Sequence, residues 1–528
     1  MKNLYFLSCF IFLGIIIQAQ DPSILWQKTI GGSSSDVVYS LQPTIDGGYV
    51  LGGYSNSNAS GEKSENSRGL IDGWIVKTNA NGTILWDKTI GGSGDDFLTS
   101  LNQTSDGGFI VGMGSNSNIS GEKTENSRGG LDFWILKLDG LGNIEWQKTF
   151  GGAQPDFDTH VFQTVDGGYF VSGYSDSDIS GDKTVPSNGQ RDYWVLKLNS
   201  SGTIVWQKSL GGSTLDRGII SIETTDGGFL IGGHSDSGIS GDKSENSRGL
   251  FDNWLVKLDE NGNKEWDKTY GGSDNDIVRD IIQIENGYII GGYSYSGISG
   301  DKTGELRGVV DYWIYKINEN GSMIWQKTIG GSQTDYLRTV RQNSDGNLLV
   351  TGYSNSNISG EKSDNSNGGF DMWFLLLNPT GEIVGQNTIG GSGDESAGYS
   401  VVLADGYIFA VASDSNQSGD KSENSKGGED YWLFKTTDNL LGTVGLEEQA
   451  SVSIFPNPTK GNFTVDFGKN YSRAEITVIN IVGKSVFSRN FISTSKEEIQ
   501  LSVPSGVYLV KIKVDNKKVM TKKLIVGE

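Results

Sequence analysis

The chain has 528 residues and a formal net charge of −21 at pH 7. This length exceeds one ordinary domain, and 76 glycines, 13 tryptophans and 20 tyrosines with only 8 prolines indicate aromatic strands joined by tight turns. We therefore expect an all-β protein rather than a disordered or collagen-like chain. The acidic charge disfavours nucleic acid and anionic membranes as partners, because phosphate binding needs a basic surface.

Residues 1–19 have the pattern of a signal peptide. Lys2 precedes an apolar run from Leu4 to Ile17, and Ala19 stands at the expected cleavage site. The run is short for a membrane span and no later segment is longer, so no transmembrane segment is expected. Cys9 is the only cysteine, and lipidation there is disfavoured because few apolar residues precede it. The mature chain therefore has no disulfide.

Residues 20–436 contain seven repeats of about sixty residues. One tryptophan series stands in W-[QD]-K-[TS]-x-G-G runs, and Gly385 takes its seventh place. A second series follows an aspartate by two positions. Repeats of this length indicate a repeat architecture. The first series is Trp26, Trp86, Trp146, Trp206, Trp266 and Trp325, and the second is Trp74, Trp134, Trp194, Trp254, Trp313, Trp373 and Trp432.

Each repeat predicts four antiparallel strands. Runs of β-branched and aromatic residues alternate with turn signals, and the D-G-G and N-G turns allow tight hairpins because glycine adopts a positive φ. In the first repeat the strands are expected at Val37–Thr44, Tyr49–Tyr54, Trp74–Thr78 and Ile84–Thr89.

The seven units fit a seven-bladed β-propeller, since four strands cannot bury both faces of their sheet alone. The repeat region opens with a lone strand, Ile24–Ile30, and its last repeat stops after the third strand, Tyr431–Lys435. The opening strand is therefore expected to complete the last blade and close the ring. A linear solenoid is the alternative, but it would need polar caps, and none is evident.

The repeat also resembles a known family. The pattern G-G-S-x-x-D, D-G-G-Y-x-x-x-G-Y-S, D-x-W-[IVL]-x-K and N-G-x-x-x-W is similar to the bacterial β-propeller repeat called the SBBP repeat. Such repeats occur in exported bacterial proteins, so the resemblance implies a fold and an exported protein. It implies no particular activity.

A second domain is expected at residues 451–528, after a linker at 437–450. It contains 12 Lys and Arg against 6 Asp and Glu, and short strands without tryptophan predict a small immunoglobulin-like β-sandwich. Its motifs are F-P-N-P from Phe455, V-G-K from Val482 and P-S-G-V-Y-L-V-K from Pro504. In this order they resemble the type A C-terminal sorting domain of the Bacteroidota type IX secretion system. The resemblance implies passage through the outer membrane, removal of the domain, and surface anchoring or release.

One carboxylate stands just before the first strand of each blade, which makes seven in all. A cation or sugar site is one interpretation. A residue repeated sevenfold more often fixes a turn by accepting backbone N–H groups, and the repeated tryptophans more often pack between blades. We therefore predict a structural role for both sets. The carboxylates are Asp36, Asp96, Asp156, Asp216, Asp276, Asp335 and Glu395.

The long loop between the second and third strands is the candidate binding segment. It recurs as S-x-S-x-x-S-G-[DE]-K, and alternating oxygen side chains before a glycine partly resemble a calcium loop. Calcium, the one cofactor that this pattern suggests, would then bind Asp176, Asp178 and Asp182, with an Asx or Ser turn as the alternative. The expected ligand-binding residues of these loops are Glu62, Glu122, Asp182, Asp242 and Asp301.

No catalytic constellation is evident. His160 and His234 are the only histidines, and no Ser-His-Asp, Cys-His or H-E-x-x-H arrangement accompanies them. The first strands break the sevenfold symmetry at a few positions. These include Tyr39, Ser40, His160, Arg279, Asp280, Arg338 and Tyr399.

We predict a monomeric binding or scaffold protein, secreted or on the outer cell surface, that contacts the type IX machinery through residues 451–528. Its partner is expected to be a polysaccharide or other surface polymer, bound by the long-loop face. The alternative is a polysaccharide hydrolase, which would need two acids across the channel, Asp280 with Asp158 or Glu223.

Overall fold

The computed structural model describes residues 24–438, 453–480, 484–514 and 518–527, which form two compact units, Met1–Val444 and Gly445–Glu528. The predicted signal peptide, most of the predicted linker, and Val482 and Gly483 lie outside the described residues. No helix in the described residues is long and apolar enough to cross a membrane.

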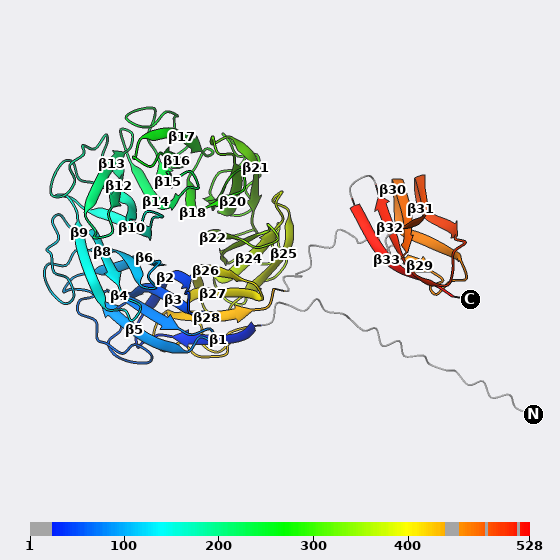
Figure 1. The fold of residues 1–528 in the computed structure, drawn as a ribbon, viewed down its shortest axis with the longest axis horizontal. Helices are drawn as coiled ribbons and strands as arrows, with labels where there is room; N and C mark the ends of the chain where they lie inside the picture. Colours follow the sequence, from blue (N-terminus) through cyan, green and yellow to red (C-terminus); the bar gives the residue numbers. More distant parts are fainter. Residues whose placement is uncertain (1–23, 439–452, 481–483, 515–517, 528) are drawn as a thin grey trace, which may run out of the picture. The chain divides into compact units, whose positions relative to one another are not determined.

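The first unit is the predicted ring of seven four-stranded antiparallel sheets (Figure 1). The first blade comprises β2 (Asp36–Pro43), β3 (Tyr49–Ser55), β4 (Asp72–Thr78) and β5 (Ile84–Ile90), within two residues of the predicted bounds. The next five blades repeat this order. They are β6 (Asp96–Gln103), β7 (Phe109–Ser115), β8 (Asp132–Leu138), β9 (Ile144–Phe150); β10 (Asp156–Gln163), β11 (Tyr169–Ser175), β12 (Asp192–Leu198), β13 (Ile204–Leu210); β14 (Asp216–Glu223), β15 (Phe229–Ser235), β16 (Asp252–Leu258), β17 (Lys264–Tyr270); β18 (Asp276–Ile284), β19 (Gly287–Ser294), β20 (Asp311–Ile317), β21 (Met323–Ile329); and β22 (Asp335–Gln342), β23 (Leu348–Ser354), β24 (Asp371–Leu377), β25 (Ile383–Ile389).

The ring closes through the opening strand, as predicted. The last blade contains β26 (Glu395–Leu403), β27 (Gly406–Ser413) and β28 (Asp430–Thr436), and β1 (Ile24–Ile30) pairs antiparallel with β28. Gln27 Oε1 accepts hydrogen bonds from Trp432 Nε1 at 3.0 Å and from the Ser422 N–H at 2.9 Å. Strands from the two ends of the repeat region therefore form one blade.

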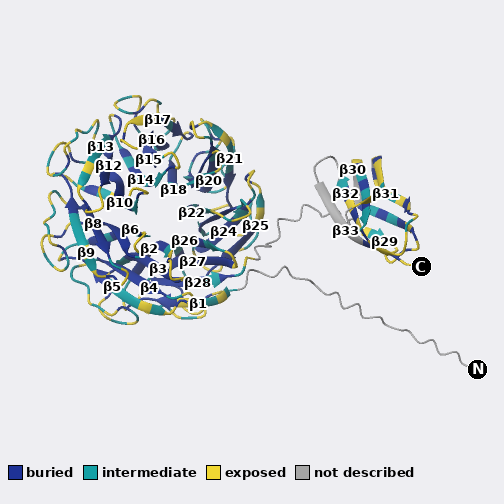
Figure 2. Ribbon diagram, viewed as in Figure 1, coloured by how far each residue is buried: buried dark blue, intermediate teal, exposed yellow. Residues whose placement is uncertain are grey.

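The second tryptophan series forms the core between blades. All seven side chains are at most 1% exposed. Trp74 of the first blade packs on Tyr431 of the last at a ring separation of 5.0 Å, and the Tyr431 hydroxyl donates to the Trp74 carbonyl. The indole N–H of Trp74 donates to Asp87 in the neighbouring strand. Figure 2 shows buried residues along the strands and exposed residues in the loops.

The G-G pair after each outer strand is required by close packing. A Cβ at Gly271 would lie 2.1 Å from Asp252 Oδ1, and one at Gly272 would lie 2.5 Å from Ser296 Cβ. Both neighbouring side chains are buried, so neither has room to move away. The pair therefore admits no larger residue.

Gly271→Ala is expected to lower the free energy of unfolding by about 3 kcal/mol or more, because overpacking displaces the buried Asp252. Gly297→Ala in the next long loop is the matched control: its Cβ would meet nothing within 4 Å. We expect that variant to stay within about 1 kcal/mol of the parent in urea-induced unfolding. Equal midpoints for the two variants would contradict the packing argument.

The second unit is a small all-β domain whose one sheet is nearly closed, consistent with the predicted β-sandwich. It contains β29 (Ser453–Phe455), β30 (Asn462–Asn480), β31 (Ser485–Gln500), β32 (Gly506–Val514) and β33 (Lys518–Val526). The long β30 pairs with β31 on one side and with β29 and β32 on the other, with an irregular register between Asp466 and Tyr471. Its core includes Phe463, Ile476 and Val510.

Candidate functional site

The two faces of the propeller differ in their loops. In the first blade β2 begins opposite the end of β3, since Asp36 pairs with Ser55, and the long loop follows Ser55. The tight Asp46-Gly47-Gly48 turn lies at the other end of the same two strands. All seven long loops therefore emerge on one face, which we call the long-loop face, and the tight turns emerge on the other.

The predicted acidic ligand-binding residues hold neighbouring blades together. Glu122 accepts from the Gly91 N–H at 3.1 Å and from Arg68 of the preceding blade at 2.6 Å. The same pair of contacts recurs around the ring. Glu62 contacts Gly31 and Lys426, Asp182 contacts Gly151 and Arg128, Asp242 contacts Gly211 and Asn188, and Asp301 contacts Gly271 and Arg248.

The three residues predicted to hold calcium contact different partners. Asp176 forms a two-pronged ion pair with Arg191 at 2.5 and 2.8 Å, Asp178 accepts from the Ser187 N–H at 3.3 Å, and Asp182 pairs with Arg128 at 3.0 Å. Among the described residues, no group of three or more His, Cys, Asp or Glu side chains is placed to hold a metal ion. Calcium binding stays a prediction that this geometry does not strengthen.

The sevenfold carboxylates lie buried between blades. Asp36 Oδ2 accepts from the Gly32 N–H at 2.6 Å and from Ser57 Oγ at 3.1 Å, and the corresponding carboxylates accept from the equivalent glycine at 2.6–2.9 Å. Burial, with a smaller contribution from nearby Asp132, raises the pKa of Asp156 to about 7. Their contacts are with the backbone and side chains of the fold.

The central channel is a place where the sevenfold symmetry breaks. The seven innermost strands are β2, β6, β10, β14, β18, β22 and β26. Each has a β-bulge about three residues from its start, which leaves one or two residues without a partner on the next strand. Bulges redirect side chains. The bulge residues are Tyr39, Thr99, Asp158 with Thr159, Ile219, Arg279, Arg338, and Ala397 with Gly398.

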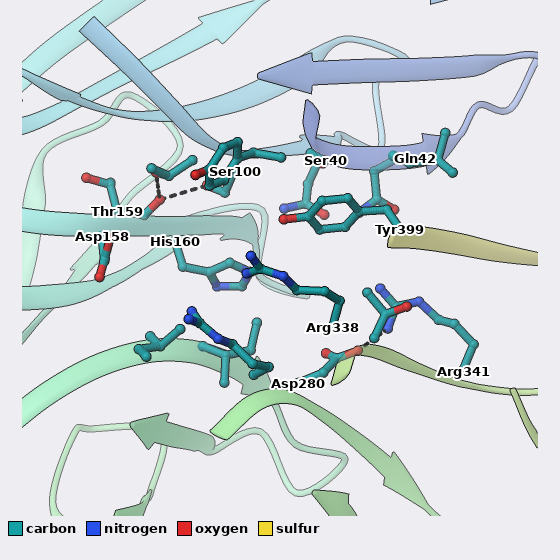
Figure 3. Close-up of a pocket in the computed structure, with 18 residues that line it drawn as sticks. Ser40, Gln42, Ser100, Asp158, Thr159, His160, Asp280, Arg338, Arg341 and Tyr399 are labelled. Atoms are coloured by element: carbon teal, nitrogen blue, oxygen red, sulfur yellow. Dashed lines mark hydrogen bonds and ion pairs between the residues drawn. The ribbon is translucent and has the colours of Figure 1, made fainter. Parts of the chain in front are cut away.

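These bulges surround a cavity of about 180 Å³. Every bulge residue except those of β26 lines it, and Tyr399 of β26 lines it one position later. Figure 3 shows Arg338 extending into the space between the strands that carry His160, Asp280 and Tyr399. Asp158 has a φ of 55°, a strained conformation for a non-glycine residue. Such strain is frequent at functional sites.

Of the three acids predicted for the alternative enzyme, only two line the same cavity. Asp158 and Asp280 line the cavity, but Glu223 is not among its lining residues and accepts from the Val165 N–H. Asp280 accepts from Arg341 at 2.5 Å and from the Val340 N–H at 2.8 Å. Burial raises the pKa of Asp158. Because Asp280 is ion-paired with Arg341, the cavity does not present the two free acids that such a hydrolase requires.

The two histidines have different surroundings, and neither has the contacts of a catalytic base. Burial lowers the pKa of His160 to about 4, so it is neutral at pH 7, and its Nδ1 lies 3.3 Å from Ser221 Oγ. Burial lowers the pKa of His234 to about 3, and its ring packs on Phe251. Neither contact is the base-to-carboxylate pairing that a hydrolytic triad requires.

Two arginines of this region were not singled out from the sequence: Arg341, which lines the cavity, and Arg217, which is not among its lining residues. Arg217 follows the ring carboxylate Asp216, and its guanidinium lies 5.1 Å from the Phe251 ring. Arg279 and Arg338 lie at 5.4 Å from Tyr293 and Tyr353 in the same manner. Arg217 stands one residue after its ring carboxylate, whereas Arg279 and Arg338 stand three residues after theirs. An arginine on the innermost strand of three consecutive blades was the available signal.

The fold and the C-terminal domain define an exported β-propeller protein. Residues 453–527 match the secretion system C-terminal sorting domain family, and this type IX sorting domain implies contact with the secretion machinery and export to the cell surface or into the medium.

Three known proteins show limited similarity. The regulatory protein FlaEY of Caulobacter vibrioides is 22% identical over 443 residues, covering 75% of this chain and 46% of that protein. An ulvan lyase of Nonlabens ulvanivorans is 30% identical over 89 residues, 16% of each chain. The chain thus spans less than half the length of these relatives. The WD40 domain of Neurospora crassa Pan2 superposes with a TM-score of 0.39 at 10% identity, covering 79% of this chain and 96% of that one.

Proposed function

We propose that this chain is a Bacteroidota protein of the SBBP-repeat type, exported after removal of a signal peptide, that binds a repetitive polymer on its long-loop face. It acts as a monomeric binding or scaffold protein, surface-anchored or released. The sorting domain supports export. The repeated exposed surface of the long loops supports the binding role.

One observation carries the binding proposal. Five of the long loops present an isoleucine at the same position, between 58% and 63% exposed, although large apolar side chains in water are unfavourable. Seven similar loops on one rigid ring offer repeated weak contacts, whose affinities combine on a repetitive partner. The isoleucines are Ile119, Ile179, Ile239, Ile298 and Ile358.

The acidic residues of the same loops support this surface indirectly. Glu62, Glu122, Asp182, Asp242 and Asp301 hold each loop to its neighbour through the contacts described above, which fixes the spacing of the isoleucines. A direct contribution of these acids, or of calcium, to polymer binding stays a prediction. A polysaccharide hydrolase is the second candidate, favoured only by the shared cavity of Asp158 and Asp280.

Replacing Ile119, Ile179 and Ile239 together by serine is expected to reduce the affinity of the full chain for a polysaccharide array at least tenfold. The reason is that several weak contacts to one polymer combine into a much higher overall affinity, so losing three of them has a large effect. The melting temperature should change little, because the three side chains are largely exposed. The matched control is Ile45→Ser with Val165→Ser, 79% and 94% exposed in the tight turns of the opposite face. Loss of binding only in that control would place the ligand on the other face and overturn the proposal.

A further inference from the structure

Three arginines of the propeller differ from all the others. Residues 24–438 contain nine arginines, and six form ion pairs with carboxylates. Among the described residues, Arg217, Arg279 and Arg338 form no such pair. Their Nε atoms are buried and have no hydrogen-bond partner. All three lie on innermost strands, in consecutive blades.

Aromatic rings hold these guanidinium groups without neutralising them. Arg279 donates to the Tyr293 hydroxyl at 3.1 Å and Arg338 donates to the Tyr353 hydroxyl at 3.3 Å, each above the ring of the same tyrosine. A guanidinium has five N–H donors, so most remain unused. The contacts therefore orient the charge and leave donors for another group.

The fold does not require arginine at these positions. Arg279 and Arg338 are bulge residues, and other blades have Tyr39, Thr99 or Ile219 at the equivalent place. Each blade is complete with any of these residues. The choice of arginine in neighbouring blades therefore needs a reason other than blade packing.

The protein balances the charge near the cavity only in part, because Asp158 interacts electrostatically with Arg279 and Arg217, and three guanidinium groups outnumber this one carboxylate. Asp280 is neutralised by Arg341, and Asp158 is the remaining carboxylate that lines the cavity. A partly buried guanidinium with no carboxylate partner and a buried, unbonded Nε carries a free-energy cost. That cost falls when an anion binds, and the planar N–H fork matches the two oxygens of a carboxylate or sulfate.

We infer that the central channel binds one oxyanion, a carboxylate or a sulfate ester, on a ligand the size of a sugar unit, through Arg279 and Arg338 with Arg217 adding charge. The cavity of about 180 Å³ is smaller than the sites of drug-sized ligands. Gln42 and Tyr399 line it and offer polar groups that suit a polyhydroxyl ligand, whereas the buried hydroxyls of Ser40 and Ser100 already donate to the Leu101 and Thr159 carbonyls. The site occurs once per molecule, so it is independent of the sevenfold loop surface.

Titration calorimetry of the full chain with glucuronate, glucose 6-sulfate and neutral glucose tests this site. At least one anionic sugar should bind, more weakly at higher salt, and glucose should bind at least about tenfold more weakly. The two anionic arms distinguish a carboxylate from a sulfate ligand. Binding of neither anion, or equal binding of glucose, overturns the proposal.

The double variant Arg279→Gln with Arg338→Gln should lose at least about tenfold in affinity for the anion that binds. Its melting temperature without ligand should be unchanged or higher, because two partly buried charges without a carboxylate partner are removed. A purely structural role would lower that temperature and leave affinity intact, which would count against the proposal. Arg307→Gln, whose arginine pairs with Glu361 outside the cavity, is the matched control and should keep its affinity. Retained binding by the triple isoleucine variant would separate this site from the proposed polymer surface.

Discussion

Deletion of Ile24–Ile30 is expected to lower the melting temperature of the propeller by roughly 10 °C or more. The deletion removes β1 from the last blade, leaves β28 as an open edge, and breaks the backbone hydrogen bonds of six paired positions, each worth about 0.5–1.5 kcal/mol. It also removes Gln27, which accepts from the Trp432 indole. Differential scanning calorimetry of the full chain and the deletion variant measures the effect.

Leu25→Ser is the control for this deletion, since Leu25 is 52% exposed on the same strand. It should melt within about 2 °C of the parent. A deletion variant that also melts within about 2 °C would show that the ring does not depend on closure by β1.

Truncation of the chain after Val444 is expected to abolish export and leave propeller stability unchanged. The sorting domain occupies residues 453–527, and the two units are compact by themselves. The truncated protein should accumulate inside the outer membrane of the producing bacterium, as measured by immunoblotting of cell fractions and medium. The isolated truncated protein should melt at the temperature of the full-length propeller.

A gain-of-function control completes this test. Residues 445–528 fused to a periplasmic reporter should carry the reporter to the surface or the medium. If the truncated chain still reaches the medium while the secretion system is intact, these residues are not the export signal.

Local chemistry and repetition determined the architecture from sequence. The spacing of the tryptophans predicts seven blades, the D-G-G and N-G turns predict the hairpins, and the lone Ile24–Ile30 strand predicts closure. These predictions are confirmed because the same strands and turns pack in the same way in all seven repeats. A pattern repeated sevenfold leaves few alternative folds.

The site depended on information that a repeat pattern does not contain. From the sequence, the acidic residues Glu122 and Asp182 were expected to bind a ligand, but they pair with arginines 54 positions earlier, in the preceding blade. The symmetry breaks at Arg279 and Arg338 were visible, yet nothing in the sequence places both side chains at one cavity or indicates the β-bulge that carries each of them.

The sequence by itself therefore determined the blade count, the closure of the ring and the sorting domain, because local strand and turn propensities and short motifs define them. Only the tertiary structure decided which charges are neutralised. Ion pairing depends on distances between residues of different blades, and those distances exist only after the ring has formed. The same physical reason separates the six paired arginines from Arg217, Arg279 and Arg338.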